Sequence, residues 1–126
     1  MHPNEKVVRD LYAARERGDL DAVAQLLAPD IDWHEPYEYL GDIKGRDHVI
    51  ETLREAIDAT GGTFRIHLHD VLANDEHAVA LVQWSARRDA RAMQGQEIAV
   101  YHVRDGVVRE VWFTANDPGS VDEFFR

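Results

Sequence analysis

The chain has 126 residues, and its 24 acidic and 14 basic side chains give a formal net charge of -10 at pH 7. This length suits one core, so we expect a single domain over residues 1–126. The acidic balance argues against binding to nucleic acids or anionic membranes, because both require a basic surface. The absence of cysteine excludes disulfides, thiol catalysis and cysteine–zinc sites.

Two further features bear on the location of the protein. The N-terminal segment MHPNEKVVRD holds no apolar signal core. No apolar run approaches the roughly 20 residues that are needed to span a bilayer. We therefore expect a cytoplasmic protein.

The chain is predicted to begin with two helices. Apolar residues at helical spacing indicate a helix over residues 5–16, with Asn4 as its cap and Gly18 behind its end. Asp19 is expected to cap a second, short helix that continues to Leu27.

A strand and a third helix are predicted next. The alternation over residues 31–35 is typical of a strand, on which Ile31, Trp33 and Glu35 share one face. After a loop, the apolar stripe over residues 46–59 predicts the third helix.

The second half of the chain is predicted to be extended. Asp105–Gly106 is a strong signal for a tight hairpin turn. A polar link is expected before residue 97, and residues 121–125 are expected to form a short apolar tail. This order indicates an α+β fold, in which helices close the concave side of a curved, mostly antiparallel sheet and leave a cone-shaped cavity. The expected strands cover residues 63–73, 78–88, 97–104 and 107–115.

Four segments, taken in order, carry a family resemblance. They are Arg17–Asp21, Trp33–Pro36, Gly45–Asp47 and Val103–Trp112. The chain resembles the SnoaL-like branch of the nuclear-transport-factor-2-like (NTF2-like) superfamily, which includes ketosteroid isomerase, over nearly its whole length. The resemblance implies a cone-shaped fold with three N-terminal helices packed on the sheet. It does not specify a reaction, because this fold hosts many functions.

The resemblance also assigns individual positions. Ketosteroid isomerases keep a carboxylate base before a proline at the end of the first strand, and Glu35 stands there, before Pro36. The two oxyanion donors of the isomerase are a tyrosine and a protonated aspartate. Their positions fall on Leu11 and Ala99, and the catalytic aspartate of the cyclase falls on Phe113. The resemblance therefore implies a retained base without its usual partners.

Glu35 is the main candidate for catalysis. On a strand face shared with Ile31 and Trp33, its carboxylate should point into the apolar interior. Desolvation there raises a carboxyl pKa and suits the group to proton transfer near neutral pH. The alternatives are a carboxylate held in a salt bridge, or one in water at the mouth of the cavity.

Two tyrosines are candidates for the missing hydroxyl donor. Tyr101 lies two residues from Ala99 and shares its strand face, and Tyr12 lies beside Leu11 on the first helix. Both are catalytic candidates, and the alternative for each is a core position with a satisfied hydroxyl. Glu97, on the other side of Ala99, is expected near the start of its strand and in solvent.

The remaining candidates are expected to contact a substrate. Trp33 and Phe113 would supply an aromatic wall for a flat apolar ligand, and they also suit a core. Tyr37 lies with Glu38 and Tyr39 in a loop that could gate the cavity. The expected substrate-binding set is Trp33, Leu11, Ala99, Phe113, Glu97 and Tyr37.

Two histidines are candidates for metal ligands. His67 and His69 lie two residues apart on a predicted strand and share a face, which is how a metal site can begin. No third ligand is evident, and His34 should point away from Glu35. We therefore expect neither a metal nor a cofactor.

Residues expected on the sheet face that points away from the pocket indicate a second protein subunit. Trp112 and Thr114 should face away from the pocket, with Trp84 near them. Bare aromatic surface of that extent indicates a covered face. Relatives often dimerise through this face, so we expect a homodimer.

Three functions fit these features. The first is a cofactor-independent enzyme that acts by general acid–base catalysis on a small apolar or polycyclic metabolite. Isomerisation, cyclisation, dehydration and epoxide opening all fit one buried carboxylate. The second is a non-catalytic domain that binds a small molecule. The third is a protein-interaction module, which would need an exposed apolar groove.

Overall fold

The computed structural model describes residues 1–126 and has four helices and one six-stranded sheet. The order of the elements is α1 (Pro3–Glu16), α2 (Leu20–Gln25), β1 (Leu27–His34), β2 (Asp42–Lys44), α3 (Arg46–Ala59), β3 (Arg65–Ala73), β4 (His77–Arg88), β5 (Arg91–Arg104), β6 (Val107–Ala115) and α4 (Pro118–Phe125). The strand order is β2-β1-β6-β5-β4-β3. β1 runs parallel to β6, and the other neighbouring pairs are antiparallel. The expected α+β class is therefore confirmed, with a mixed sheet.

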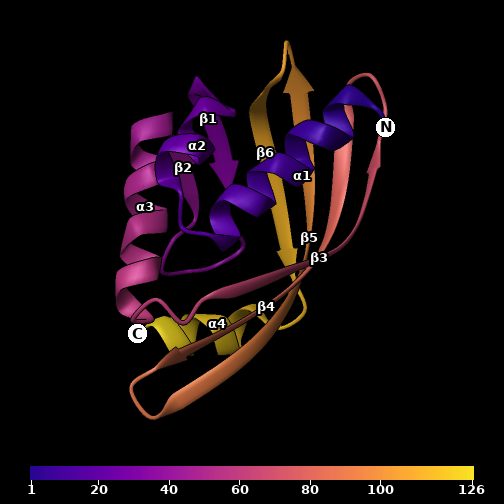
Figure 1. Cartoon of the computed structure of the whole chain (residues 1–126). Helices are drawn as coiled ribbons and strands as arrows, with labels where there is room; N and C mark the ends of the chain where they lie inside the picture. The colour runs from indigo at the N-terminus through magenta and orange to yellow at the C-terminus, as the bar shows by residue number, and fades with distance from the viewer.

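The helices and the sheet enclose the core between them. Figure 1 shows α1, α2 and α3 on one side of the curved sheet, and α4 below it, where the β4–β5 hairpin curls round. α1 packs through Val8, Leu11 and Tyr12, which recur at helical spacing and are all buried. None of the four helices has both the length and the apolar composition that a membrane crossing needs.

The first two helices differ slightly from their predicted ends. α1 begins at Pro3 instead of residue 5, because His2 is its cap and accepts a hydrogen bond from the backbone N–H of Asn4. α2 ends at Gln25, and β1 already begins at Leu27. Pro29 fits in this strand because the pairing with β6 shifts register between Leu27 and Asp32.

β5 is longer than the sequence predicts. It begins at Arg91, so the predicted polar link is part of a long hairpin with β4. The turn is closed by Asp89, which has a φ of 57°. Polar residues such as Gln94 and Gln96 can stand in a strand here because their positions on it are exposed.

The C-terminal segment is a helix, where the sequence predicts only an apolar tail. Asp117 caps α4 by accepting from the backbone N–H of Ser120. The buried carboxylate of Asp122 accepts from the backbone N–H groups of Glu38 (3.1 Å) and Tyr39 (3.0 Å). α4 is thereby held against the loop that follows β1, and it closes the lower end of the cone.

Candidate functional site

A cavity of about 290 Å³ lies between the helices and the sheet. Its lining is mainly apolar and includes Tyr37, Tyr39, Phe64, Trp84 and Phe125. Four ionisable residues other than tyrosine also reach it, namely Arg15, Glu35, Glu55 and Glu97. The volume is at the small end of the range for ligand pockets, about 300–1,000 Å³. The cavity therefore suits a compact ligand with an aromatic or apolar body.

Glu35 lies on the cavity wall directly after the end of β1. Its side chain follows Trp33 on the inward face, and the indole Nε1 of Trp33 donates a 2.7 Å hydrogen bond to its Oε1. Burial, and then the nearby charge of Glu97, raise the pKa of Glu35 from 4.5 to about 7. The Trp33 hydrogen bond and the charge of Arg15 oppose this rise. A carboxyl with this pKa can accept or release a proton near neutral pH.

Glu97 is the second carboxyl of the site. It was expected in solvent near a strand start, but β5 begins six residues earlier and Glu97 lies on the cavity wall. Its Oε2 is 3.4 Å from the hydroxyl of Tyr37, which donates to it. Burial raises the pKa of Glu97 above its ordinary value, against the opposing effects of Arg15 and the Tyr37 hydrogen bond. The structure thus brings Glu35, Glu97 and Tyr37 to one cavity.

Arg15 contributes the positive charge of the site. It lies in the last turn of α1, and its guanidinium carbon is 5.5 Å from the ring centre of Tyr12 and 5.9 Å from that of Trp33. Its Nη1 is buried and has no hydrogen-bond partner. Leaving a buried donor without an acceptor costs about 1–3 kcal/mol, and more when the donor is charged.

The two candidate tyrosines lie behind the cavity. The hydroxyl of Tyr101 donates a 2.6 Å hydrogen bond to the hydroxyl oxygen of Tyr12, and both rings are buried. Burial raises the pKa of both hydroxyls, so both stay protonated. Neither residue is part of the cavity lining.

We expect the loss of one tyrosine hydroxyl to affect stability more than binding. Tyr101→Phe leaves the Tyr12 hydroxyl buried without its donor, so unfolding in urea should require about 1–2 kcal/mol less free energy. The double variant Tyr12→Phe/Tyr101→Phe should recover part of this loss, because it leaves no orphan hydroxyl. A large loss of activity in Tyr101→Phe without loss of stability would instead assign the hydroxyl to catalysis.

The aromatic wall includes the Trp84 indole, which packs directly on Gly95 of the neighbouring strand. Trp84 pairs with Gly95 across β4 and β5, and it stacks on Phe64 with ring centres 5.2 Å apart. It was expected on the outer face with Trp112, and that expectation was wrong. Trp84 shares the inward face of β4 with Val82, and its exposed fraction is 6%.

Comparison with known proteins identifies the family. Residues 8–111 match the SnoaL-like domain family. The chain belongs to this family. An uncharacterised protein from Mycobacterium tuberculosis is 30% identical over 122 residues, which cover 94% of this chain and 93% of the relative.

Solved structures agree with this membership. Bal32a, from a soil-derived mobile gene cassette, has a TM-score of 0.92 at 28% identity and covers 98% of this chain and 97% of its own. An NTF2-like protein of unknown function from Burkholderia pseudomallei has a TM-score of 0.87 at 24% identity, over 99% and 98% of the two chains. The predicted resemblance to the SnoaL-like family is confirmed, and the fold is one that NTF2-like proteins share.

The expected positions of this SnoaL-like protein divide into two groups. Glu35, Glu97 and Tyr37 line the cavity. The other expected residues lie in the buried core around the cavity and not on its lining. They are Leu11, Tyr12, Trp33, Ala99, Tyr101 and Phe113. Trp33 still reaches the site indirectly, through its hydrogen bond to Glu35.

Sequence reasoning missed one functional candidate of this SnoaL-like site, Arg15. Its signal was present, because Arg15 follows Val8 and Leu11 at helical spacing and is thus a charged residue on an apolar helix face. The sequence also did not indicate that α3 and α4 contribute to the cavity wall. Their apolar residues have a pattern that is typical of an ordinary core.

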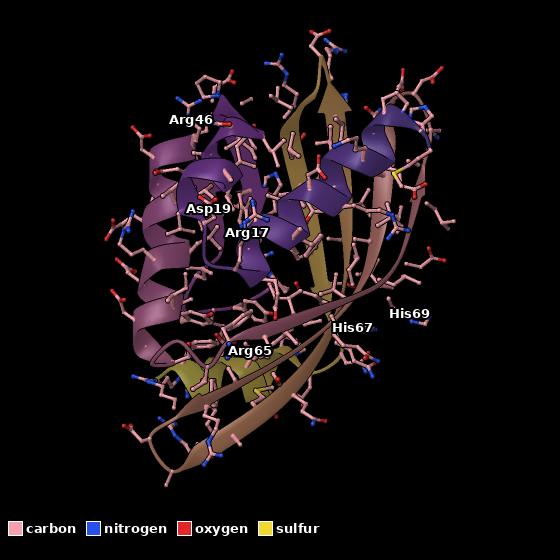
Figure 2. The ribbon with its side chains drawn as sticks, viewed as in Figure 1. Arg17, Asp19, Arg46, Arg65, His67 and His69 are labelled. Atoms are coloured by element: carbon pink, nitrogen blue, oxygen red, sulfur yellow. The ribbon has the colours of Figure 1, made fainter.

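The histidines lie outside the cavity. His67 and His69 are exposed on β3, and Figure 2 shows them pointing away from the helices. No group of three potential ligands that could hold a metal ion is present. His34 faces away from Glu35 and bonds to Asp42 (2.8 Å) and Glu110 (2.7 Å).

Proposed function

We propose that this protein is a cofactor-independent enzyme in which Glu35 acts as general base and acid on a compact, largely aromatic or apolar metabolite. The observation that carries the proposal is the position of Glu35. Its carboxyl lies on the wall of an apolar cavity, fixed by the Trp33 indole, and its pKa of about 7 suits proton transfer.

The surroundings of Glu35 favour catalysis over simple binding. A binding pocket needs only a few polar groups to orient a ligand. Here Arg15, Glu97 and the Tyr37 hydroxyl reach the same cavity as Glu35. An acid–base pair and a charged donor at one cavity are the components that proton-transfer sites use.

A non-catalytic binding domain is the second candidate. It is favoured by the Tyr12–Tyr101 pair, whose hydroxyls bind each other behind the cavity and add no donor to it. In that case Glu35 would orient a ligand without exchanging protons with it.

A general-base probe separates the two functions. 5-Nitrobenzisoxazole is a compact bicyclic compound that opens to a coloured phenolate when a base removes its ring proton. We expect the protein to accelerate this opening, with a rate that rises as the pH passes about 7 and Glu35 ionises. The same rate in Glu35→Gln as in the wild type would exclude Glu35 as the base.

We also propose that the protein is a homodimer that pairs through the outer face of the sheet. The pairing of neighbouring strands places four apolar residues in one row across β3, β4, β5 and β6, namely Leu72, Val79, Val100 and Trp112. Leu72, Ile98 and Trp112 are 66%, 45% and 40% exposed. An apolar row of this length is typical of a protein–protein contact.

The dimer can be tested by mass in solution. We expect light scattering to give twice 14.4 kDa for the wild type and a monomer for Ile98→Asp, because a buried charge at the contact is strongly unfavourable. Ala13→Asp, on the exposed side of α1, adds the same charge elsewhere and should remain dimeric. A monomeric wild type at micromolar concentration would contradict the prediction.

A further inference from the structure

The wall of the cavity includes a charged side chain, Arg15, that forms no ion pair within the protein. Arg15 Nη1 is buried without a hydrogen-bond partner. Arg15 takes part in none of the ion pairs of the structure. A guanidinium stays protonated at any physiological pH, so this positive charge is permanent.

The neighbouring carboxyls do not supply the missing partner. Oε1 of Glu35 accepts from the Trp33 indole, and Oε2 of Glu97 accepts from the Tyr37 hydroxyl. Both carboxyls favour the protonated form more than an ordinary glutamate does, because they are buried. Neither carboxyl forms an ion pair with Arg15, so the guanidinium can still pair with a negative charge that a ligand brings.

The guanidinium is held in place for a ligand. Its guanidinium carbon lies within about 6 Å of the ring centres of Tyr12 and Trp33, and cation–π attraction to both rings favours this position on the cavity wall. The lining opposite is apolar and aromatic, with Phe64, Trp84 and Phe125. The site thus offers one charged donor and an apolar enclosure for a flat ring system.

We propose that Arg15 anchors the substrate of this site, and that the substrate is a compact aromatic compound with an ionised oxygen, from a carboxyl or an acidic hydroxyl group, which accepts a hydrogen bond from the Arg15 guanidinium. The proposal rests on the proposed function, since it places the ligand of that cavity next to Glu35. It adds the charge and the shape of the substrate.

Matched probes test the anchor by binding alone. 2-Naphthoate and 2-naphthamide have the same shape and differ in charge, and 2-cyano-4-nitrophenolate presents a phenolate oxygen instead of a carboxylate. Titration at about pH 6, where Glu35 is mainly protonated, should show that the wild type prefers naphthoate to naphthamide. The preference should be about 10- to 100-fold, as expected for a charged hydrogen bond. The stronger binder of the two anions identifies the source of the oxygen.

Substitutions assign the preference to Arg15. Arg15→Gln should lose it, and Arg15→Lys, which keeps the charge, should retain part of it. Arg17→Gln is the matched control, because it removes the same charge from the same end of α1 where Arg17 lies beside Asp19, outside the cavity lining (Figure 2). Circular dichroism of each variant checks the fold, and Arg15→Lys decides the question if Arg15→Gln does not fold.

The outcomes keep the two proposals apart. Equal binding of naphthoate and naphthamide by the wild type, or an unchanged preference in both Arg15 variants, overturns the anchor. The preference should persist in Glu35→Gln, since binding needs no proton transfer. If Glu35→Gln stays active on 5-nitrobenzisoxazole while the Arg15 dependence holds, the catalytic function fails and the anchor stands. If Glu35→Gln is inactive while the Arg15 variants keep the preference, the anchor fails and the catalytic function stands.

Discussion

Glu35→Gln is expected to lose proton-transfer activity and, at the same time, to be more stable than the wild type above neutral pH. Glutamine has nearly the shape of a protonated glutamate, and its Oε1 can still accept from the Trp33 indole. It has no proton to exchange, so the rate on a general-base probe should fall by about 10²–10⁴-fold. The substitution also removes a buried negative charge, which the wild type carries above pH 7.

The sign of the stability effect follows from the pKa. Glu35 titrates at about 7 in the folded protein and at its ordinary 4.5 in the unfolded chain. Between these values the folded state binds more protons, so the free energy of unfolding falls as the pH rises. The contribution is fully present below 4.5 and is lost as the pH passes about 7. Above that, the charged form costs up to about 3 kcal/mol, which Glu35→Gln avoids.

Urea unfolding of both proteins at several pH values measures this difference. The two should be about equally stable at about pH 4, and Glu35→Gln should be more stable at about pH 9. The pKa of Glu97 is also raised, and Glu97 is present in both proteins. The difference between the two proteins therefore reports the titration of Glu35 together with its electrostatic coupling to Glu97. Glu38→Gln, exposed in the adjacent loop, should change neither activity nor the pH dependence. A difference in stability that is independent of pH would show that Glu35 is not the group that titrates.

Gly95→Ala is expected to destabilise the fold strongly, although it adds a single methyl group. A Cβ at this position would lie 2.2 Å from Cε2 and Nε1 of the Trp84 indole, well inside contact distance. The indole cannot move freely, because Phe64 stacks on it and Phe124 and Phe125 pack beside it. Overpacking of this kind costs about 1–3 kcal/mol or more, so the midpoint of thermal unfolding should fall by on the order of 10 °C.

The same change should affect the ligand site, because Trp84 lines the cavity. A displaced indole would fill part of its volume, and the affinity for 2-naphthoate should drop with the stability. Gly119→Ala is the matched control, since its Cβ would meet only Asp117 Oδ1 at 3.9 Å. Adding Trp84→Phe to Gly95→Ala should return part of the lost stability by giving room for the methyl group. Wild-type stability in Gly95→Ala would mean that the Trp84 indole does not lie this close to Gly95.

Much of the fold could be predicted from local patterns. α3 and β6 have the predicted ends, because a regular apolar stripe and a Gly-containing turn are strong local signals. The start of β5 and the helix α4 could not be predicted. Their residues have weak propensities, and they take their structure from partners, β4 for the strand and the loop after β1 for the helix.

The sequence by itself determined the family, the α+β order and the inward direction of Glu35, because these depend on periodicity and on residues close together in the chain. Only the tertiary structure decided which polar groups meet. Glu35 directly follows β1, and Glu97 and Arg15 come from β5 and α1. The three reach one cavity only after the sheet has curved around the helices. The pKa of Glu35 likewise depends on burial and on the charge of Glu97, both of which exist only in the folded chain. From the sequence, the hydroxyls of Tyr12 and Tyr101 were candidate donors to a substrate. In the fold they lie 2.6 Å apart and form a hydrogen bond with each other.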